Sequence, residues 1–286
     1  MLNEKGRIQS ELTITRLPDN IFYVLSSTAS EIRDLDWFNH HIKKEENVSI
    51  KNVTNNYGVL VLAGPNSRKV FSQLTSQNLH NNDFPWLKGK EILINKIPVR
   101  ALRVNYVGEL GWELHHPMSQ MESLYDAIYE VGKKENIINF GTYAVNSLRM
   151  EKAYRGWGSE LTGEISLVES GMNRFFNLKK KNNFIGANAL EKRVQSGVDI
   201  KIVYLEVEVN DVDARGNEPV YHNNKVVGIV TSGGYGFRTK KSLAFAYVKS
   251  DVAETSNLEV EIQGTKRRAK ILHKVVYDPD NKKLTA

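Results

Sequence analysis

Short apolar segments follow one another closely from Lys201 to Val276, and this pattern constrains the fold more than any other feature of the sequence. Each segment has the length and the apolar content of a strand, and turn-forming residues separate it from the next. A series of short strands at this spacing predicts a small β barrel. The segments are Ile202–Val209, Pro219–His222, Val226–Thr231, Leu243–Val248, Leu258–Ile262 and Ala269–Val276.

The chain before this region mixes strand and helix patterns. Residues 6–17 alternate, with Ile8, Leu12 and Ile14 on one face, which is typical of a strand. Further strands are predicted at 22–25, 57–63, 92–94, 99–106 and 111–115. Helices are predicted from the capping candidates Thr28, Asn66, Ser119 and Thr142, and again over 186–194.

The change of pattern places a domain boundary near residue 196. The polar residues 195–197 follow the last predicted helix and precede the first barrel strand. We therefore expect an α+β body over residues 1–196 and a carboxy-terminal barrel domain over residues 197–286. Asn95-Lys96 and Val107-Gly108 are candidate hairpin turns in the body, and hairpins require antiparallel neighbours.

Composition excludes several kinds of chemistry. Cysteine is absent, so disulfides, thiolate metal sites and cysteine nucleophiles are excluded. The pairs His40-His41 and His115-His116 lack the i, i+4 spacing of two ligands on a helix, and no metal site is predicted. There is neither an apolar run long enough to span a membrane nor an apolar signal core, so we expect a cytoplasmic protein.

The formal charge of +6 raises the question of nucleic acid. Much of the excess lies in short surface-type runs such as Lys266-Arg267-Arg268, which are common on soluble proteins. A net positive charge is equally compatible with an anionic small ligand. We predict no nucleic-acid partner.

The segment Tyr106-Val107-Gly108-Glu109-Leu110-Gly111-Trp112-Glu113-Leu114 carries the most specific motif. It resembles the tyrosine, glycine, glutamate, glycine, aromatic, glutamate motif of the glycine cleavage T-protein family. The resemblance implies that Tyr106 lies against a folate and that Glu113 binds its aminopyrimidine edge. A carboxylate suits this role, because it accepts two parallel hydrogen bonds from adjacent N–H groups.

A plainer interpretation of the same residues remains open. Gly108 and Gly111 shape a hairpin in this interpretation, with Tyr106 in the core and Glu113 exposed on an alternating strand. The residues by themselves favour this interpretation, because short glycine motifs occur often by chance. The family resemblance reverses that preference.

A second signature, residues 146–161, resembles the carboxy-terminal folate-binding region of dimethylglycine and sarcosine dehydrogenases. It contains Arg149, Tyr154 and Trp157, which the resemblance implies are folate-binding. The alternative is packing at the end of a helix with a local ion pair. A third stretch, residues 231–236, resembles the barrel of the family, and its glycines permit a tight loop.

Glu11 is the candidate catalytic residue. Its segment aligns with the part of the family where an acidic residue, commonly aspartate, approaches the folate nitrogen and the transferred carbon. The resemblance implies that Glu11 assists proton transfer there. An exposed glutamate on a half-buried strand is the alternative interpretation.

The implied reaction is capture of an iminium or formaldehyde-level carbon by tetrahydrofolate, from dimethylglycine or sarcosine, to give 5,10-methylenetetrahydrofolate. Three alternatives stay open: the glycine cleavage aminomethyltransferase, a folate-dependent sulfonium demethylase of the same fold, and a non-catalytic folate-binding module. The discriminator between the enzymes is the one-carbon donor.

The resemblance does not include the first part of the family fold, because family members have a further stretch before the segment that corresponds to residues 6–17. We expect a truncated start, or missing strands supplied by a partner. The chain lacks a glycine-rich dinucleotide fingerprint, so FAD is expected only with a separate or missing flavin domain or subunit. The chain by itself should not oxidise an amine. No membrane partner is predicted.

Overall fold

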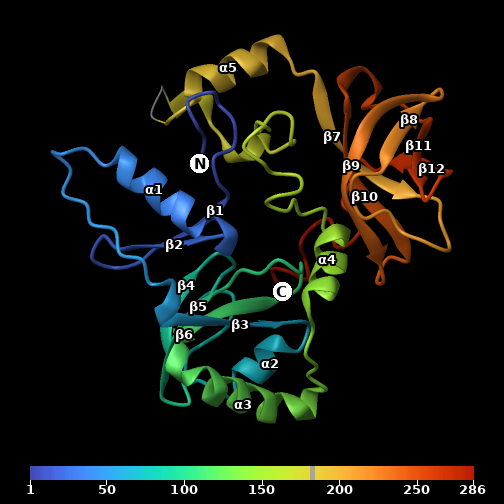
Figure 1. The fold of residues 1–286 in the computed structure, drawn as a ribbon. Helices are drawn as coiled ribbons and strands as arrows, with labels where there is room; N and C mark the ends of the chain where they lie inside the picture. The colour runs from blue at the N-terminus through green and yellow to red at the C-terminus, as the bar shows by residue number, and fades with distance from the viewer. Residues whose placement is uncertain (181–183) are drawn as a thin grey trace. The chain divides into compact units, whose positions relative to one another are not determined.

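The computed structural model describes residues 1–180 and 184–286 (Figure 1). Contacts within the chain group them into two compact units. The first comprises Met1–Ile14, Tyr23–Asp36 and Arg149–Tyr277, and the second comprises Thr15–Phe22, Trp37–Leu148 and Asp278–Ala286. Each unit is built from segments distant in sequence, and the predicted domain boundary near residue 196 remains a prediction.

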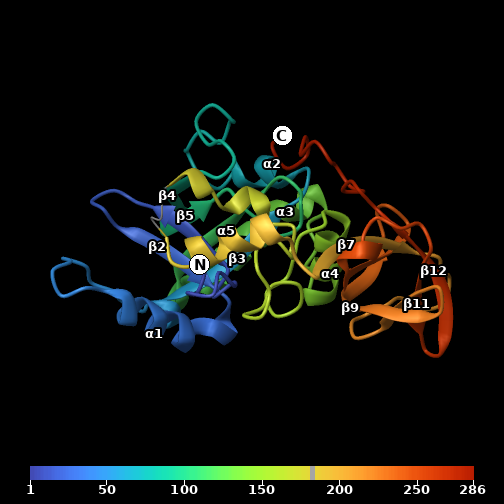
Figure 2. The same cartoon turned by 90° about the horizontal axis from the view of Figure 1, so that it is seen from above.

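The first unit contains a closed barrel with the strand order β10-β7-β12-β11-β8-β9. All neighbouring strands of this barrel are antiparallel. Figures 1 and 2 show the barrel from two directions. The predicted barrel is therefore confirmed. The strands are β7 (Ile200–Val207), β8 (Pro219–His222), β9 (Lys225–Gly236), β10 (Lys241–Lys249), β11 (Leu258–Ile262) and β12 (Thr265–Ile271).

Strand β10 contributes to the core from both of its faces, which are buried. Ala244, Ala246 and Val248 belong to the core cluster inside the barrel. Leu243 and Phe245 alternate with them and pack in a second cluster with Met150. A strand that is buried on both faces has a continuous apolar sequence, and this segment has one.

The glycines predicted to form a tight loop lie instead within β9, which runs through Gly236. A Cβ added at Gly233 would overlap the carbonyl oxygen of Ala214 and would lie 3.1 Å from that of Leu243. The prediction of a loop is therefore wrong. Glycine is required here because two other backbone segments approach the strand closely.

Gly233→Ala is expected to lower the free energy of unfolding by about 1–3 kcal/mol, because the added methyl overpacks the barrel wall. Gly163→Ala is the matched control, since its Cβ would lie 3.9 Å from the nearest heavy atom, the Ile8 oxygen. Urea unfolding of both variants measures the difference. Equal stability would show that the barrel wall absorbs the methyl group.

The strand predicted over residues 6–17 is shorter in the structure, where β1 (Leu12–Arg16) pairs with β2 (Phe22–Ser26). Residues before it form a turn, in which Gly6 has a φ of 68° and the backbone N–H of Arg7 donates to the side chain of Asn3. Ile8 is buried, but Ile14 is 57% exposed. The predicted common face fails because Ile8 lies outside β1, in an isolated bridge with Leu2.

Three helices lie at or near predicted positions. Helix α1 (Glu31–His41) is preceded by a 3-10 turn, Thr28–Ser30, and helix α5 (Ala187–Ser196) follows Gly186. The predicted cap at Thr28 is wrong, because the 3-10 turn displaces the N-cap to Ser27. Helix α4 (Thr142–Glu151) includes Thr142 in its first turn.

The second unit contains an antiparallel sheet with the order β3-β6-β5-β4. Its strands are β3 (Tyr57–Ala63), β4 (Gly89–Ile94), β5 (Ile97–Leu102) and β6 (Gly111–Pro117). Helices α2 (Ser67–Phe71) and α3 (Met121–Gly132) cover one face of this sheet (Figure 1). Together with the barrel, this mixed body confirms the predicted α+β class.

The turns of this sheet were partly predictable. Asn95 and Lys96, both with positive φ, join β4 to β5 as expected. The predicted strand 99–106 is too long, because β5 ends at Leu102. The side chain of Asn105 accepts hydrogen bonds from the backbone of Val107 and Gly108, which holds the following residues in a loop.

The carboxy-terminal segment of the second unit packs beside Trp112. Arg68 and Arg103 both donate to the main-chain oxygen of Ala286 at 2.8 Å, and both guanidinium groups lie within 6 Å of the Trp112 ring centre. Burial, together with the charge of Arg68, lowers the pKa of Arg103 to about 10. Arg103 therefore remains charged at neutral pH.

Two sequence observations have a structural counterpart. The basic run Lys266-Arg267-Arg268 lies in β12, opposite Glu259 and Glu261 of β11, and Arg267 also pairs with Asp211. Cross-strand carboxylates thus balance much of its charge.

Among residues 1–180 and 184–286, no helix is long and apolar enough to cross a membrane.

Candidate functional site

Polar side chains gather on the face of the four-stranded sheet that α2 and α3 leave uncovered. On β6, Trp112 and Leu114 point into the core, and Glu113 and His115 alternate with them. The register places His115 opposite Arg100 of β5 and opposite Val59 of β3. Paired residues in a sheet share a face, so these side chains are neighbours.

The carboxylate of Glu113 lies 3.4 Å from Nε2 of His115. Its side chain is 25% exposed, whereas the imidazole is 1% exposed. Within the part of the chain that the structure describes, His115 is the one hydrogen-bond partner of the Glu113 carboxylate. Glu113 therefore keeps acceptor capacity on a partly open oxygen pair.

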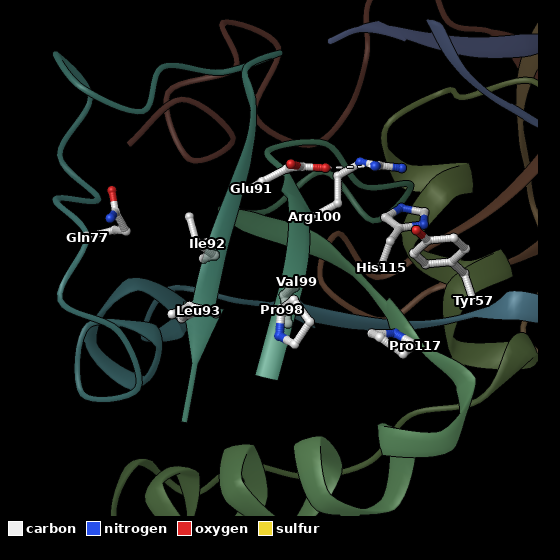
Figure 3. Close-up of a pocket in the computed structure, with 10 residues that line it drawn as sticks. All are labelled: Tyr57, Gln77, Glu91, Ile92, Leu93, Pro98, Val99, Arg100, His115 and Pro117. Atoms are coloured by element: carbon white, nitrogen blue, oxygen red, sulfur yellow. Dashed lines mark hydrogen bonds and ion pairs between the residues drawn. The ribbon is translucent and has the colours of Figure 1, made fainter. Parts of the chain in front are cut away.

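A cavity of about 360 Å³ adjoins this pair (Figure 3). It is lined by the sheet, including Arg100, His115 and Tyr57, whose side chains lie together in the view. Arg100 pairs with Glu91 at 2.7 Å, and its guanidinium lies 5.7 Å from the centre of the Tyr57 ring. The wall of the cavity therefore presents the Tyr57 ring and the Arg100–Glu91 ion pair beside His115.

Tyr106 lies in the loop that connects β5 to β6, and 39% of the residue is exposed. The plainer interpretation is therefore wrong in placing Tyr106 in the core. The loop has its own hydrogen bonds, since the side chain of Asn105 also donates to the main-chain oxygen of Glu109 at 2.8 Å. A tyrosine at such a position presents a flat apolar face and a polar tip.

Arg149 is committed to a buried ion pair in the first unit. Its Nη1 lies 3.0 Å from Glu160, and the two side chains are 6% and 0% exposed. The same nitrogen donates to the main-chain oxygen of Tyr154. Glu160 also accepts from the backbone of Gly156 at 2.7 Å. The pair therefore fixes the conformation of the segment that contains Tyr154 and Trp157.

Trp157 is half-buried beside helix α1. Its indole N–H donates to Ser30 at 3.1 Å, and the guanidinium of Arg33 lies 4.8 Å from its ring centre. Glu11 is exposed and directly follows Ser10, whose hydroxyl donates to the buried Asp34 at 2.7 Å. Burial lowers the pKa of the Met1 amino group, and the charges of Glu11 and Asp34 oppose that shift.

The structure therefore distributes the predicted site residues over both units. Tyr106 and Glu113 belong to the second, and Glu11, Arg149, Tyr154 and Trp157 belong to the first. The sequence prediction missed His115, Arg100 and Tyr57. The two-residue spacing of Glu113 and His115 on one strand was the signal that could have identified His115. Among the described residues, no cluster of potential metal ligands occurs.

The sequence matches two known domain families. Residues 1–180 match the GCVT N-terminal domain, and residues 201–278 match the glycine cleavage T-protein C-terminal barrel domain. The chain belongs to the glycine cleavage T-protein family. The resemblance stated from the two motifs is thereby confirmed.

Relatives of this T-protein family member include aminomethyltransferases and larger dehydrogenases. It is 42% identical to human mitochondrial dimethylglycine dehydrogenase over 288 residues, which cover 99% of this chain and 33% of that protein. It is 31% identical to a Thermoanaerobacter aminomethyltransferase, covering 99% of this chain and 76% of that protein. The chain thus spans about a third of the dehydrogenase that it matches.

A solved structure supports the fold. Aminomethyltransferase T of the glycine cleavage system from Bartonella henselae superposes with a TM-score of 0.84 at 21% identity, over 98% of this chain and 75% of that chain. The body and the barrel are therefore the family fold.

Proposed function

We propose that this chain binds tetrahydrofolate and captures a one-carbon unit at the iminium or formaldehyde level from a methylated amine such as dimethylglycine or sarcosine. The product is 5,10-methylenetetrahydrofolate. The observation that carries the proposal is the Glu113 carboxylate, which is partly exposed and has one hydrogen-bond partner, His115, within the described residues. Two adjacent N–H groups of a pterin edge match such a carboxylate.

The other predicted residues have supporting roles in this proposal. Tyr106 lies against the folate ring from its exposed loop. Tyr154 and Trp157 line the ligand, and Arg149 contributes through the segment that it holds by its contacts with Glu160 and Tyr154. Glu11 handles a proton near the folate nitrogen, and its exposure lets it reach a bound ligand. Much of the rate gain then comes from proximity.

The partners are part of the proposal. The relatives named dimethylglycine and sarcosine dehydrogenases are about three times longer than the matched region, which supports a flavin domain or subunit. Its FAD would oxidise the methylated amine, and the oxidised amine would supply the one-carbon unit. Location in the cytoplasm and a domain boundary near residue 196 remain predictions.

A second candidate function is the aminomethyl transfer of the glycine cleavage system. The relative named aminomethyltransferase supports it, because this chain covers 76% of that protein. The two candidates share the folate site and differ in the one-carbon donor. Product assays with dimethylglycine, with sarcosine and with a glycine cleavage carrier protein separate them.

Titration calorimetry with folinic acid tests the shared part of both proposals. We expect measurable binding by the folded protein, with a stoichiometry of one ligand per chain. Absence of binding by the parent protein in its complete form would reject a folate site.

Glu11→Gln is expected to reduce formation of methylenetetrahydrofolate by about 10²-fold or more, the usual scale for general acid-base assistance. Folate affinity should change much less, because the substitution preserves the shape of the side chain. Glu11→Asp should retain more activity than Glu11→Gln, since it keeps the ionisable group. The measurement compares coupled folate turnover with amine oxidation in the complete enzyme.

Glu4→Gln is the matched control, because it removes the same charge from another exposed position near the start of the chain. A rate equal to that of the parent in Glu11→Gln would contradict the catalytic role. A parallel loss of amine oxidation would locate the defect in the flavin reaction instead.

A further inference from the structure

We infer that His115 is a positioning residue for Glu113, holding one carboxylate oxygen so that the open side of the carboxylate faces the pterin edge. The inference rests on the proposed function. It concerns a residue outside both family motifs, which the sequence prediction did not assign to the site. The contact between the two side chains, 3.4 Å from Nε2 to Oε2, is its starting point.

Strand geometry brings the two side chains together. Residues i and i+2 of a strand point to the same face, so Glu113 and His115 of β6 are neighbours along the strand. The side chain of Glu113 is 25% exposed, whereas that of His115 is 1% exposed. The imidazole therefore forms the buried end of the contact, and the carboxylate forms the open end.

Chemistry fixes the direction of the hydrogen bond. An ionised carboxylate only accepts, so Nε2 of His115 must carry the proton. A donor at this point selects one orientation of the Glu113 carboxylate, because the terminal torsion of a glutamate side chain otherwise takes a broad range of values. The carboxylate is then presented in one orientation before the ligand arrives, and less ordering is needed on binding.

The surroundings of His115 suit a buried imidazole. Arg100 is opposite in the register on β5, and Val59 is opposite on β3. Arg100 is itself paired with Glu91 at 2.7 Å and lies beside Tyr57. Of the described residues that line the cavity together with His115, Arg100, Glu91 and Tyr57 are charged or titratable (Figure 3). Glu113 contacts His115 from the same strand. Arg100 has its own carboxylate partner, and Glu113 remains available to His115.

A double-mutant cycle tests the inference with folinic acid as the ligand. His115→Leu removes the donor and should weaken binding by about 10- to 100-fold, the effect of losing a hydrogen bond to a charged group. His115→Gln retains a donor amide at the place of Nε2 and should recover most of the affinity. In a Glu113→Ala background, His115→Leu should have little further effect, because His115 acts through Glu113.

A ligand-free measurement keeps the inference testable if His115→Leu fails to fold. Nitrogen NMR shifts of the His115 imidazole in the parent protein report which nitrogen is protonated. We expect a protonated Nε2, in the neutral or the cationic ring. A bare Nε2 facing Glu113 would overturn the inference, and so would an undiminished effect of His115→Leu in the Glu113→Ala background.

The outcomes separate the inference from the proposed function. Failure of the parent protein to bind folinic acid would reject the proposed function together with the role of His115 in it. Binding by the parent without energetic coupling between the two residues would reject the role of His115 and leave the folate site intact.

Discussion

Glu160→Ala is expected to lower the free energy of unfolding by about 3–5 kcal/mol, the usual cost of breaking a buried ion pair from one side. The Glu160 side chain is fully buried, and its carboxylate accepts from Arg149, Gly156, Ser159, Thr231 and Ser232. Removing it takes the Glu160 carboxylate away from the buried Arg149 guanidinium. Urea unfolding, followed by far-UV circular dichroism, measures the loss.

Two comparisons make this prediction specific. Glu164→Ala removes a carboxylate from an exposed position of the same segment and should change stability by less than about 0.5 kcal/mol. Arg149→Met combined with Glu160→Leu removes both charges and should be less destabilising than Glu160→Ala alone. A stability of Glu160→Ala equal to that of Glu164→Ala would show that the carboxylate does not organise this region.

The network around Glu160 also uses neutral donors. The hydroxyl of Tyr247 donates to the main-chain oxygen of Glu160 at 2.7 Å, and burial raises the pKa of this tyrosine. The hydroxyl of Tyr204 donates to the main-chain oxygen of Met150 in the same way. Burial raises the pKa of both phenols, so they remain neutral donors across the physiological range, and their hydrogen bonds to Met150 and Glu160 do not depend on ionisation.

Glu113→Ala is expected to weaken the binding of tetrahydrofolate by about 2–5 kcal/mol, the range for truncating one partner of a buried hydrogen-bonded charge pair. The carboxylate is three-quarters buried beside His115, so water replaces its hydrogen bonds to the ligand poorly. Isothermal titration calorimetry on the parent protein and the variant measures the difference. The effect should appear in affinity, because the residue holds the pterin rather than reacting.

Glu122→Ala is the matched control for this measurement. It removes a carboxylate from the exposed surface of α3, in the same unit, and should leave affinity unchanged. Glu113→Gln retains one acceptor oxygen and should lie between the parent and Glu113→Ala. Equal affinities for Glu113→Ala and the parent would remove Glu113 from the folate site.

Much of the backbone was predictable because local patterns carry it. Residues 57–63, a continuous apolar run ended by Gly64 and Pro65, form β3 as expected. The strand 258–262 alternates between buried and half-buried positions and likewise forms β11 with the predicted bounds. Periodicity of this kind determines which face a residue presents, and short-range turn signals determine where the strand ends.

Side-chain partners were less predictable, because they come from distant parts of the chain. Glu160 contacts Thr231 and Ser232, about 70 residues further along the sequence. Gly233 was expected in a loop and lies in a strand, since its neighbours Ala214 and Leu243 require a residue without a side chain. No local window contains these relationships.

The sequence by itself determined the α+β class, the barrel after residue 200 and the family, through two motifs whose residue types and spacing are specific. Only the tertiary structure decided that Tyr106 lies in a loop, that Arg149 is buried against Glu160, and that His115 contacts Glu113. The physical reason is that hydrogen-bond partners and burial depend on how elements pack. The periodicity of one segment reports only which face is apolar.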